Sequence, residues 1–283
     1  MAQQPFGFCL NTSTLRGQRL GIVREIEIAA AAGYQGIEPW ISELEEYEQG
    51  GGSLEDLRRR IEDAGLQVAG AIGFAEWIVD DAPRRATGLE VARRDMERVR
   101  AIGGRWLAAP PAGAQAQEDL DLTQAAARYR TLLELGATVG VTPLLEVWGH
   151  SKTLSRLADA MQVAVASQHS DAALLLDVYH LYKGGSGYDA LHLVAGGAMP
   201  LLHINDFPGR PDRRTITDAD RVFPGDGVAP LRAILQTLRD TGFCGMLSLE
   251  LFNEDYWQLD PGEVASSGLE KMQAVVAAAL GGF

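Results

Sequence analysis

The sequence Leu174-Leu175-Leu176-Asp177 is a continuous apolar run that ends in a carboxylate. Three further leucine-rich runs end in an acidic or imidazole side chain, namely Leu144-Leu145-Glu146, Leu201-Leu202-His203 and Leu247-Ser248-Leu249-Glu250. An uninterrupted leucine-rich run is typical of a strand buried on both faces of a parallel sheet, whereas a strand with one wet face alternates. The four runs therefore predict four parallel strands, each with a polar side chain at its carboxyl end.

Strand-like and helix-like segments alternate along the whole chain. The predicted strands are 6–10, 36–40, 67–73, 105–109, 142–148, 173–179, 200–205 and 246–251. The predicted helices are 18–32, 54–64, 86–102, 122–139, 154–166, 189–194, 229–240 and 263–280. Several of these helices are followed by a glycine, which suits a left-handed cap before the next strand. This order predicts eight βα units.

Eight βα units are compatible with a closed (β/α)8 barrel or with an open doubly wound sheet. The open sheet is the weaker alternative, because no GxGxxG follows the first strand, where a dinucleotide-binding sheet needs it. An eightfold barrel needs about 250 residues, and the chain has 283 without a linker rich in Ser, Pro or Gly. We therefore predict an α/β fold, a (β/α)8 TIM barrel, as a single domain over residues 1–283.

Four strand-end side chains form the candidate metal site: Glu146, Asp177, His203 and Glu250. The carboxyl ends of barrel strands face one mouth, and neighbouring strands lie about 4.8 Å apart. Three carboxylates and an imidazole suit one divalent cation, which would also neutralise their charge. We expect Mn²⁺, with Mg²⁺, Co²⁺ or Zn²⁺ as alternatives. Taken singly, each residue could instead cap a helix or pair with a lysine.

Four more polar side chains are expected to bind substrate near the mouth: Glu38, His150, His180 and Arg221. Glu38 ends the second strand, and His180 lies just beyond the sixth. Arg221 lies in the longest irregular stretch, 207–228, and long loops in compact domains are usually functional. Each has a structural alternative, which is helix capping for the glutamate, packing for the histidines and exposure to solvent for the arginine.

The bulk composition argues against several classes of protein. The net charge is −13, with 38 acidic and 25 basic residues, which disfavours nucleic-acid and membrane partners. The chain has two cysteines and no CxxC pair, no GxSxG elbow, no apolar run of about 18 residues and no signal-peptide pattern. We expect a cytoplasmic enzyme with a small-molecule substrate, and a homo-oligomer is compatible with the sequence.

Four stretches of the chain resemble the xylose isomerase-like TIM barrel superfamily of sugar isomerases and epimerases. They are LEVWGH at 145–150, LDVYH at 176–180, TDADRVFPG at 217–225 and SLELF at 248–252. Within the superfamily the chain is most similar to the 2-keto-myo-inositol (inosose) isomerases. The resemblance implies metal ligands at Glu146, Asp177, His203 and Glu250. Its substrate-side histidine and arginine fall on His180 and Arg221.

The resemblance implies a metal-dependent isomerase of a cyclic keto-polyol or a ketose. Glu146 and Glu250 would be the catalytic acid/base pair, and a cis-enediolate bound to the metal would be the intermediate. An inosose dehydratase, a keto-sugar lyase or a ketose 3-epimerase would use the same enolate. The 3-epimerases usually carry another glutamate shortly after the first ligand, where this chain has Ser151, Lys152 and Thr153.

Two alternatives belong to other classes. A catalytically silent sugar-binding barrel is the non-enzyme alternative. A metal-dependent endonuclease on the related barrel would need clustered histidines and a basic groove, whereas the chain has five histidines and an acidic balance.

Overall fold

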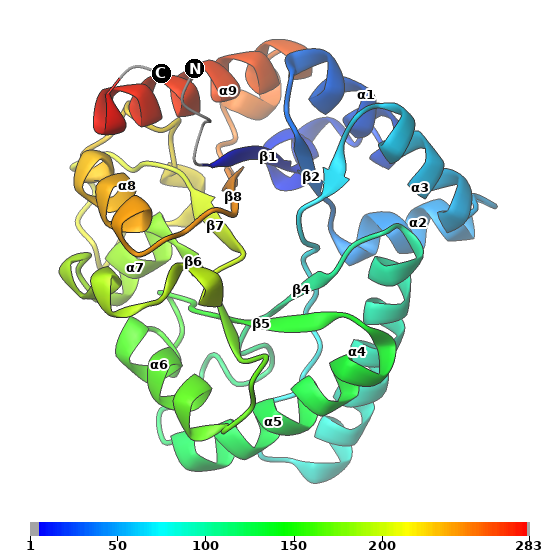
Figure 1. Cartoon of the computed structure of the whole chain (residues 1–283), viewed down its shortest axis with the longest axis vertical. Helices are drawn as coiled ribbons and strands as arrows, with labels where there is room; N and C mark the ends of the chain where they lie inside the picture. Colours follow the sequence, from blue (N-terminus) through cyan, green and yellow to red (C-terminus); the bar gives the residue numbers. More distant parts are fainter. Residues whose placement is uncertain (1–5, 282–283) are drawn as a thin grey trace.

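Eight parallel strands form one curled sheet at the centre of the computed structural model, which describes residues 6–281 (Figure 1). The order of the strands is β3-β2-β1-β8-β7-β6-β5-β4. Their bounds are β1 Gly7–Asn11, β2 Gly36–Glu38, β3 Gln67–Val68, β4 Trp106–Ala109, β5 Thr142–Glu146, β6 Ala173–Asp177, β7 Leu201–Ile204 and β8 Met246–Leu249. The predicted domain bounds at residues 1 and 283 lie outside the described residues.

The two ends of the sheet meet just beyond β3. The Ala71 N–H donates to the Trp106 carbonyl over 3.1 Å, and the Ala108 N–H donates to the Ala71 carbonyl over 2.9 Å. These two bonds join the segment after β3 to β4. The expected (β/α)8 barrel is confirmed, with strands that are shorter than the sequence suggests.

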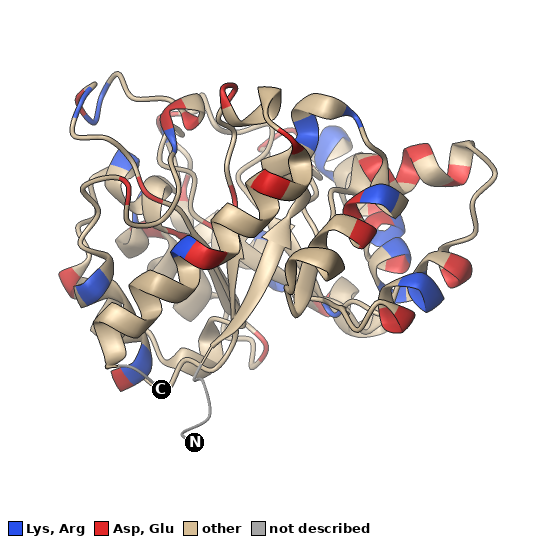
Figure 2. Ribbon diagram, turned by 90° about the horizontal axis from the view of Figure 1, so that it is seen from above, with Lys and Arg blue, Asp and Glu red and all other residues tan. Residues whose placement is uncertain are grey.

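Helices surround the sheet on its outer side (Figure 1). They are α1 Ile22–Ala32, α2 Ile41–Gln49, α3 Leu54–Asp63, α4 Ala82–Ala101, α5 Leu122–Val139, α6 Leu157–Ala166, α7 Val178–Gly184, α8 Leu231–Asp240 and α9 Pro261–Leu280. Aspartates Asp81, Asp121 and Asp260 cap α4, α5 and α9 by accepting from backbone N–H groups. In the side view of Figure 2, acidic and basic residues are interspersed along these helices.

Three sequence predictions about elements were wrong. The sixth strand ends at Asp177 and not at residue 179, because the Asp177 carboxylate accepts the His180 N–H over 2.8 Å and caps α7. The predicted helix 189–194 is a 3₁₀ turn, Asp189–Leu193. Helix α2 was not predicted, and Glu43 caps its start by accepting the Trp40 N–H over 2.9 Å.

Alternate residues of each strand face two different cores. In β6, Leu174 and Leu176 pack outward against helices, whereas Ala173 and Leu175 pack inside the barrel. Both faces are apolar, which explains the continuous leucine run. Because side chains alternate with a period of two, Asp177 continues the inward series of 173 and 175. The same alternation turns Glu146, His203 and Glu250 inward, in step with Leu144, Leu201 and Met246.

Both cysteines are free thiols: Cys9 is buried inside the barrel, and Cys244 is exposed. Among residues 6–281, no helix has both the length and the apolar character needed to cross a lipid bilayer.

Candidate metal centre and active-site mouth

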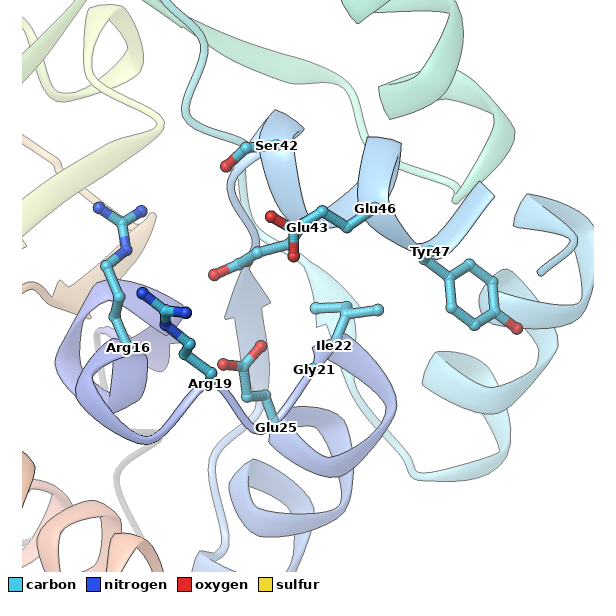
Figure 3. Close-up of a pocket in the computed structure, with 9 residues that line it drawn as sticks. All are labelled: Arg16, Arg19, Gly21, Ile22, Glu25, Ser42, Glu43, Glu46 and Tyr47. Atoms are coloured by element: carbon cyan, nitrogen blue, oxygen red, sulfur yellow. The ribbon is translucent and has the colours of Figure 1, made fainter. Parts of the chain in front are cut away.

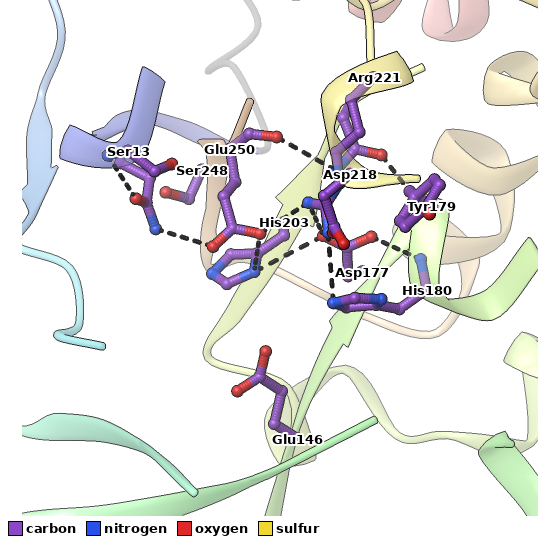
Figure 4. A network of polar contacts seen from close by, with 12 residues as sticks. Ser13, Glu146, Asp177, Tyr179, His180, His203, Asp218, Arg221, Ser248 and Glu250 are labelled. Atoms are coloured by element: carbon purple, nitrogen blue, oxygen red, sulfur yellow. Dashed lines mark hydrogen bonds and ion pairs between the residues drawn. The ribbon is translucent and has the colours of Figure 1, made fainter. Parts of the chain in front are cut away.

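Asp177, His203 and Glu250 converge at the carboxyl ends of β6, β7 and β8 (Figure 4). One ligand atom from each lies within 4.8 Å of the other two. The His203 Nδ1 is 3.2 Å from Glu250 Oε2 and 3.7 Å from Asp177 Oδ2. All three side chains are buried. We call these three residues the trio.

Glu146 stands apart from the trio, at the end of β5 (Figure 4). Its Oε1 accepts the Trp148 Nε1–H over 3.0 Å, and its Oε2 is buried without a hydrogen-bond partner among residues 6–281. Burial raises the pKa of Glu146 to about 8. A buried oxygen without a hydrogen-bond donor costs folding free energy, so this carboxylate would be stabilised by binding a metal ion or a proton.

Glu38 fixes the other side of the His203 ring. Its two oxygens lie 3.2 and 3.1 Å from His203 Nε2, and Oε2 also accepts from Ser248 Oγ over 2.7 Å and from Asn11 Nδ2 over 2.9 Å. Because a carboxylate only accepts hydrogen bonds, the His203 Nε2 carries a proton, and Nδ1 faces Asp177 and Glu250. The sequence places Glu38 among the substrate-binding candidates. The structure puts it behind His203, fully buried and outside the lining of the mouth.

Arg221 is buried in the same network although it comes from the long loop after β7. Its Nη1 lies 3.0 Å from Asp177 Oδ2 and 2.8 Å from Glu250 Oε2, and its Nη2 pairs with Asp218. The side chain is 0% exposed, so solvent does not surround it. Asp218 was not among the predicted site residues, although it lies within the loop motif that carries Arg221.

His180 is neutral in this setting. Burial and the charge of Arg221 lower the pKa of His180 to about 3. Arg221 Nη2 lies 3.2 Å from its Nε2, and a guanidinium only donates, so Nε2 accepts and Nδ1 carries the proton. That Nδ1–H has no partner among the described residues. His150 lies at the rim, with its ring centroid 5.5 Å from that of His180.

Opposing effects set the charges of the trio. Burial raises the pKa of Asp177 to about 6, against the influence of Arg221. Burial alone would also raise the pKa of Glu250, but His203 and Arg221 outweigh it and hold that pKa well below its usual range. Burial by itself would lower the pKa of His203, and the charges of Glu250 and Glu38 raise it instead.

The donor set fits a divalent cation. Glu146 Oε2 is buried and lacks a hydrogen-bond partner among residues 6–281, and the buried His203 Nδ1 faces only the carboxylate oxygens of Asp177 and Glu250. An imidazole nitrogen whose other N–H is held by a carboxylate is the usual arrangement of a metal-binding histidine. Carboxylate oxygens and one imidazole suit Zn²⁺, Mn²⁺ and Mg²⁺. All four predicted ligands therefore lie at one mouth, three of them in a tight group.

A cavity of about 230 Å³ opens above this centre. Besides Glu146, Glu250, His180, Arg221 and His150, its lining contains Trp40, Ile72, Phe74, Trp148, Asp218 and Phe252. Four aromatic rings form a wall: Trp40 lies 5.1 Å from Phe74 and 6.0 Å from Phe252, and Phe74 lies 5.9 Å from Trp148, between ring centroids.

The barrel and its mouth place the chain in a class of (β/α)8 proteins with a polar cluster at the carboxyl ends of the strands. Residues 26–275 match the family model described as xylose isomerase-like TIM barrel, and the chain belongs to this family.

Two curated relatives are inosose isomerases. The one from Bacillus velezensis is 29% identical over 184 residues, which cover 64% of this chain and 65% of the relative. The one from Bacillus subtilis is 30% identical over 146 residues, which cover 51% and 52%. The matches thus span between half and two thirds of these relatives.

A solved structure described as the IOLI protein with a binding zinc atom has a TM-score of 0.89, 22% identity, and covers 98% of this chain and 100% of its own. This likeness confirms the barrel.

Proposed function

We propose that this protein is a metal-dependent isomerase of a keto-polyol or ketose, similar to an inosose isomerase. The observation that carries the proposal is the convergence of Asp177, His203 and Glu250 within 4.8 Å at the mouth of a barrel of this family. The names of the inosose isomerase relatives and the zinc atom in the IOLI structure support it.

The trio would hold the ion, and Glu146 would complete the site from the other side. When bound, the cation acts as a Lewis acid that stabilises the negative charge developing on an α-hydroxy ketone. Mn²⁺ remains our expectation, and Zn²⁺, Mg²⁺ and Co²⁺ accept the same ligand types. Glu38 would keep His203 in the tautomer that exposes Nδ1.

Glu146 and Glu250 would exchange the proton that isomerisation moves. The Oε2 of Glu146 has no competing donor among residues 6–281, and a cation bound beside it would favour its ionised form, which can accept a proton from a substrate carbon. Glu250 approaches from β8, and its Oε1 accepts only a long bond of 3.3 Å from Asn11. Removal of the proton from the hydroxyl-bearing carbon would give an enediolate. Its return to the former carbonyl carbon, with transfer of the hydroxyl proton to the former carbonyl oxygen, would move the carbonyl group by one position.

The remaining polar groups would orient the substrate. The His180 Nδ1–H is a free donor for a substrate oxygen. Arg221, held by Asp177 and Glu250, keeps those carboxylates ionised. The aromatic wall offers apolar surface to the C–H face of a ring and excludes water. The cavity of about 230 Å³ is smaller than the ~300–1,000 Å³ of drug-sized sites, which suits a single ring.

The test follows 2-keto-myo-inositol and a panel of ketoses by NMR in D₂O with metal-loaded protein. We expect conversion to a positional isomer with solvent deuterium at the new C–H position, and loss of at least about a hundredfold in rate for Glu146→Gln and Glu250→Gln. Glu27→Gln, on the exposed side of α1, is the control. A metal-loaded protein that neither converts nor labels any of these compounds would refute the proposal. Growth of an ultraviolet-absorbing enone would indicate dehydration instead.

A further inference from the structure

A second and larger cavity, of about 660 Å³, lies beside the mouth (Figure 3). Its walls come from the 3₁₀ helix η1 (Thr12–Gln18), from the start of α1 and from α2. The elements η1 and α2 directly follow β1 and β2. The cavity therefore lies on the face of the barrel that carries the candidate metal centre.

Glu25 is the residue that needs explaining in this cavity. It lies in the first turn of α1, is 2% exposed, and its Oε2 has no hydrogen-bond partner within residues 6–281. Figure 3 shows the carboxyl group directed into the cavity, toward Arg19 and Glu43. A buried carboxyl group without a partner costs about 1–3 kcal/mol or more, so a ligand that reaches it would relieve that cost.

The cavity offers unused groups of both signs. Arg16 and Arg19 take part in no ion pair or hydrogen bond through their side chains in the described part of the chain, and Glu46 is exposed. Glu43 is already engaged, because its Oε2 accepts from Thr12 Oγ1 over 2.7 Å and from the Trp40 N–H. In such a mixed lining Glu43 and Glu46 oppose a phosphate, and Arg16 and Arg19 oppose a simple cation, so neither sign of charge is favoured throughout the cavity. Hydroxyl groups satisfy both, since each donates and accepts.

The charge state of Glu25 supports a neutral ligand. Burial and the nearby charge of Glu43 raise the pKa of Glu25 to about 8. At neutral pH the group is mostly protonated, so it can donate to one hydroxyl and accept from another without a cation.

A stacked pair, Arg16 on Trp40, separates this cavity from the mouth. The Arg16 guanidinium lines the larger cavity and lies 3.4 Å from the centroid of the Trp40 ring, which lines the mouth. A hydrogen bond of 3.0 Å from the Trp40 Nε1 to Asn11 Oδ1 holds the indole in place. The two cavities are therefore neighbours on the same face of the barrel, with one guanidinium and one indole between them.

We propose that the cavity between η1, α1 and α2 is a second subsite, which binds the hydroxyl-rich distal unit of a two-part substrate, a keto-sugar or keto-polyol that carries a second sugar ring. The inference deepens the function proposed for the mouth and rests on it. The mouth would hold the reacting ring, and Glu25, Arg16 and Arg19 would bind hydroxyl groups of the distal ring.

The test measures binding of methyl β-D-glucopyranoside and of three disaccharides (cellobiose, maltose and lactose) to the full chain, by calorimetry and saturation-transfer NMR. We expect at least one disaccharide to bind about tenfold more tightly than the methyl glucoside. Ser42→Trp, which fills the cavity from an exposed position on α2, should remove that advantage. Glu25→Gln should reduce it several-fold, and Glu27→Gln on the same helix should leave it unchanged.

Equal binding of all four sugars, or a disaccharide advantage that survives Ser42→Trp, would overturn the subsite. Competition by n-butylammonium at millimolar concentration would also overturn it, since that outcome would indicate a cation site. Turnover of single-ring keto-inositols without any disaccharide advantage would refute the subsite and leave the proposed function intact. A disaccharide advantage that depends on Ser42, in a protein that turns over no ketone, would refute the function and leave the subsite.

Discussion

Replacing Glu38 by glutamine tests how the barrel prepares His203 for a metal ion. The Glu38 carboxylate accepts from three buried donors: His203 Nε2, Ser248 Oγ and Asn11 Nδ2. Glutamine keeps one oxygen and replaces the other by an NH₂ group, which cannot accept. At least one of the three donors must then lose its partner or face another donor.

The magnitude follows from those contacts. One buried donor left without a partner costs about 1–3 kcal/mol of folding free energy. Loss of a carboxylate behind a metal-binding histidine typically weakens metal binding by about 10–100-fold, which corresponds to about 1.4–2.8 kcal/mol. We expect Glu38→Gln to lose both the folding free energy and the metal-binding free energy given above. Its loss of metal affinity should exceed the loss caused by replacing any buried carboxylate outside the site.

The assay is competition calorimetry of Zn²⁺ and Mn²⁺ against a chelator, combined with denaturant unfolding of the metal-free protein. Asp95→Asn is the matched control, because Asp95 is also a buried carboxylate, 3% exposed, but lies on α4 outside the trio. If Glu38→Gln folds and binds either metal within twofold of the parent protein, Glu38 does not position His203 and the reasoning fails.

Three further predictions concern the metal and the buried charges. Asp177→Asn should weaken metal binding more than Glu146→Gln does, by at least about tenfold, because Asp177 belongs to the trio; equal losses in calorimetry would count against this ranking. Zn²⁺ at a hundred times its Kd should raise the free energy of unfolding by about 2.7 kcal/mol, measured by denaturant melts with EDTA as the reversal control, and an unchanged midpoint would contradict it. Burial raises the pKa of Asp95 to about 6, above the value near 4 in the unfolded chain. Between these two pH values the folded state binds more protons than the unfolded state, so the free energy of unfolding falls as the pH rises through that window. Asp95→Asn should remove this fall and be more stable than the parent protein at pH 8, by up to about 3 kcal/mol; parallel stability profiles from pH 4 to 8 would refute it.

The strand ends were predictable from the sequence because two physical patterns coincide there. A run such as Leu174–Leu176 is apolar on both faces only if the strand lies between two cores, and both cores are present. The period-two alternation then carries Asp177 to the inside of the barrel, and the same holds for His203. For this reason the sequence could bring together residues that are far apart in the chain.

Other parts of the site depend on packing that has no local pattern. Helix α7 begins within the predicted strand because Asp177 caps it, so one carboxylate serves both as a cap and as a member of the trio. Trp40 and Phe74 reach the mouth from the segments after β2 and β3, where a bridge between Trp40 and Ile72 brings the two ring centroids within 5.1 Å. The position of Glu38 behind His203 likewise follows from the neighbourhood of strands across the barrel.

Anomalous diffraction from crystals loaded with Zn²⁺ or Mn²⁺ would locate the ion itself. We expect one strong peak about 2.0–2.3 Å from the imidazole Nδ1 of His203 and from carboxylate oxygens of Asp177 and Glu250, with Glu146 approaching from β5. A peak elsewhere on the barrel, or a metal bound through Nε2 of that histidine, would contradict it.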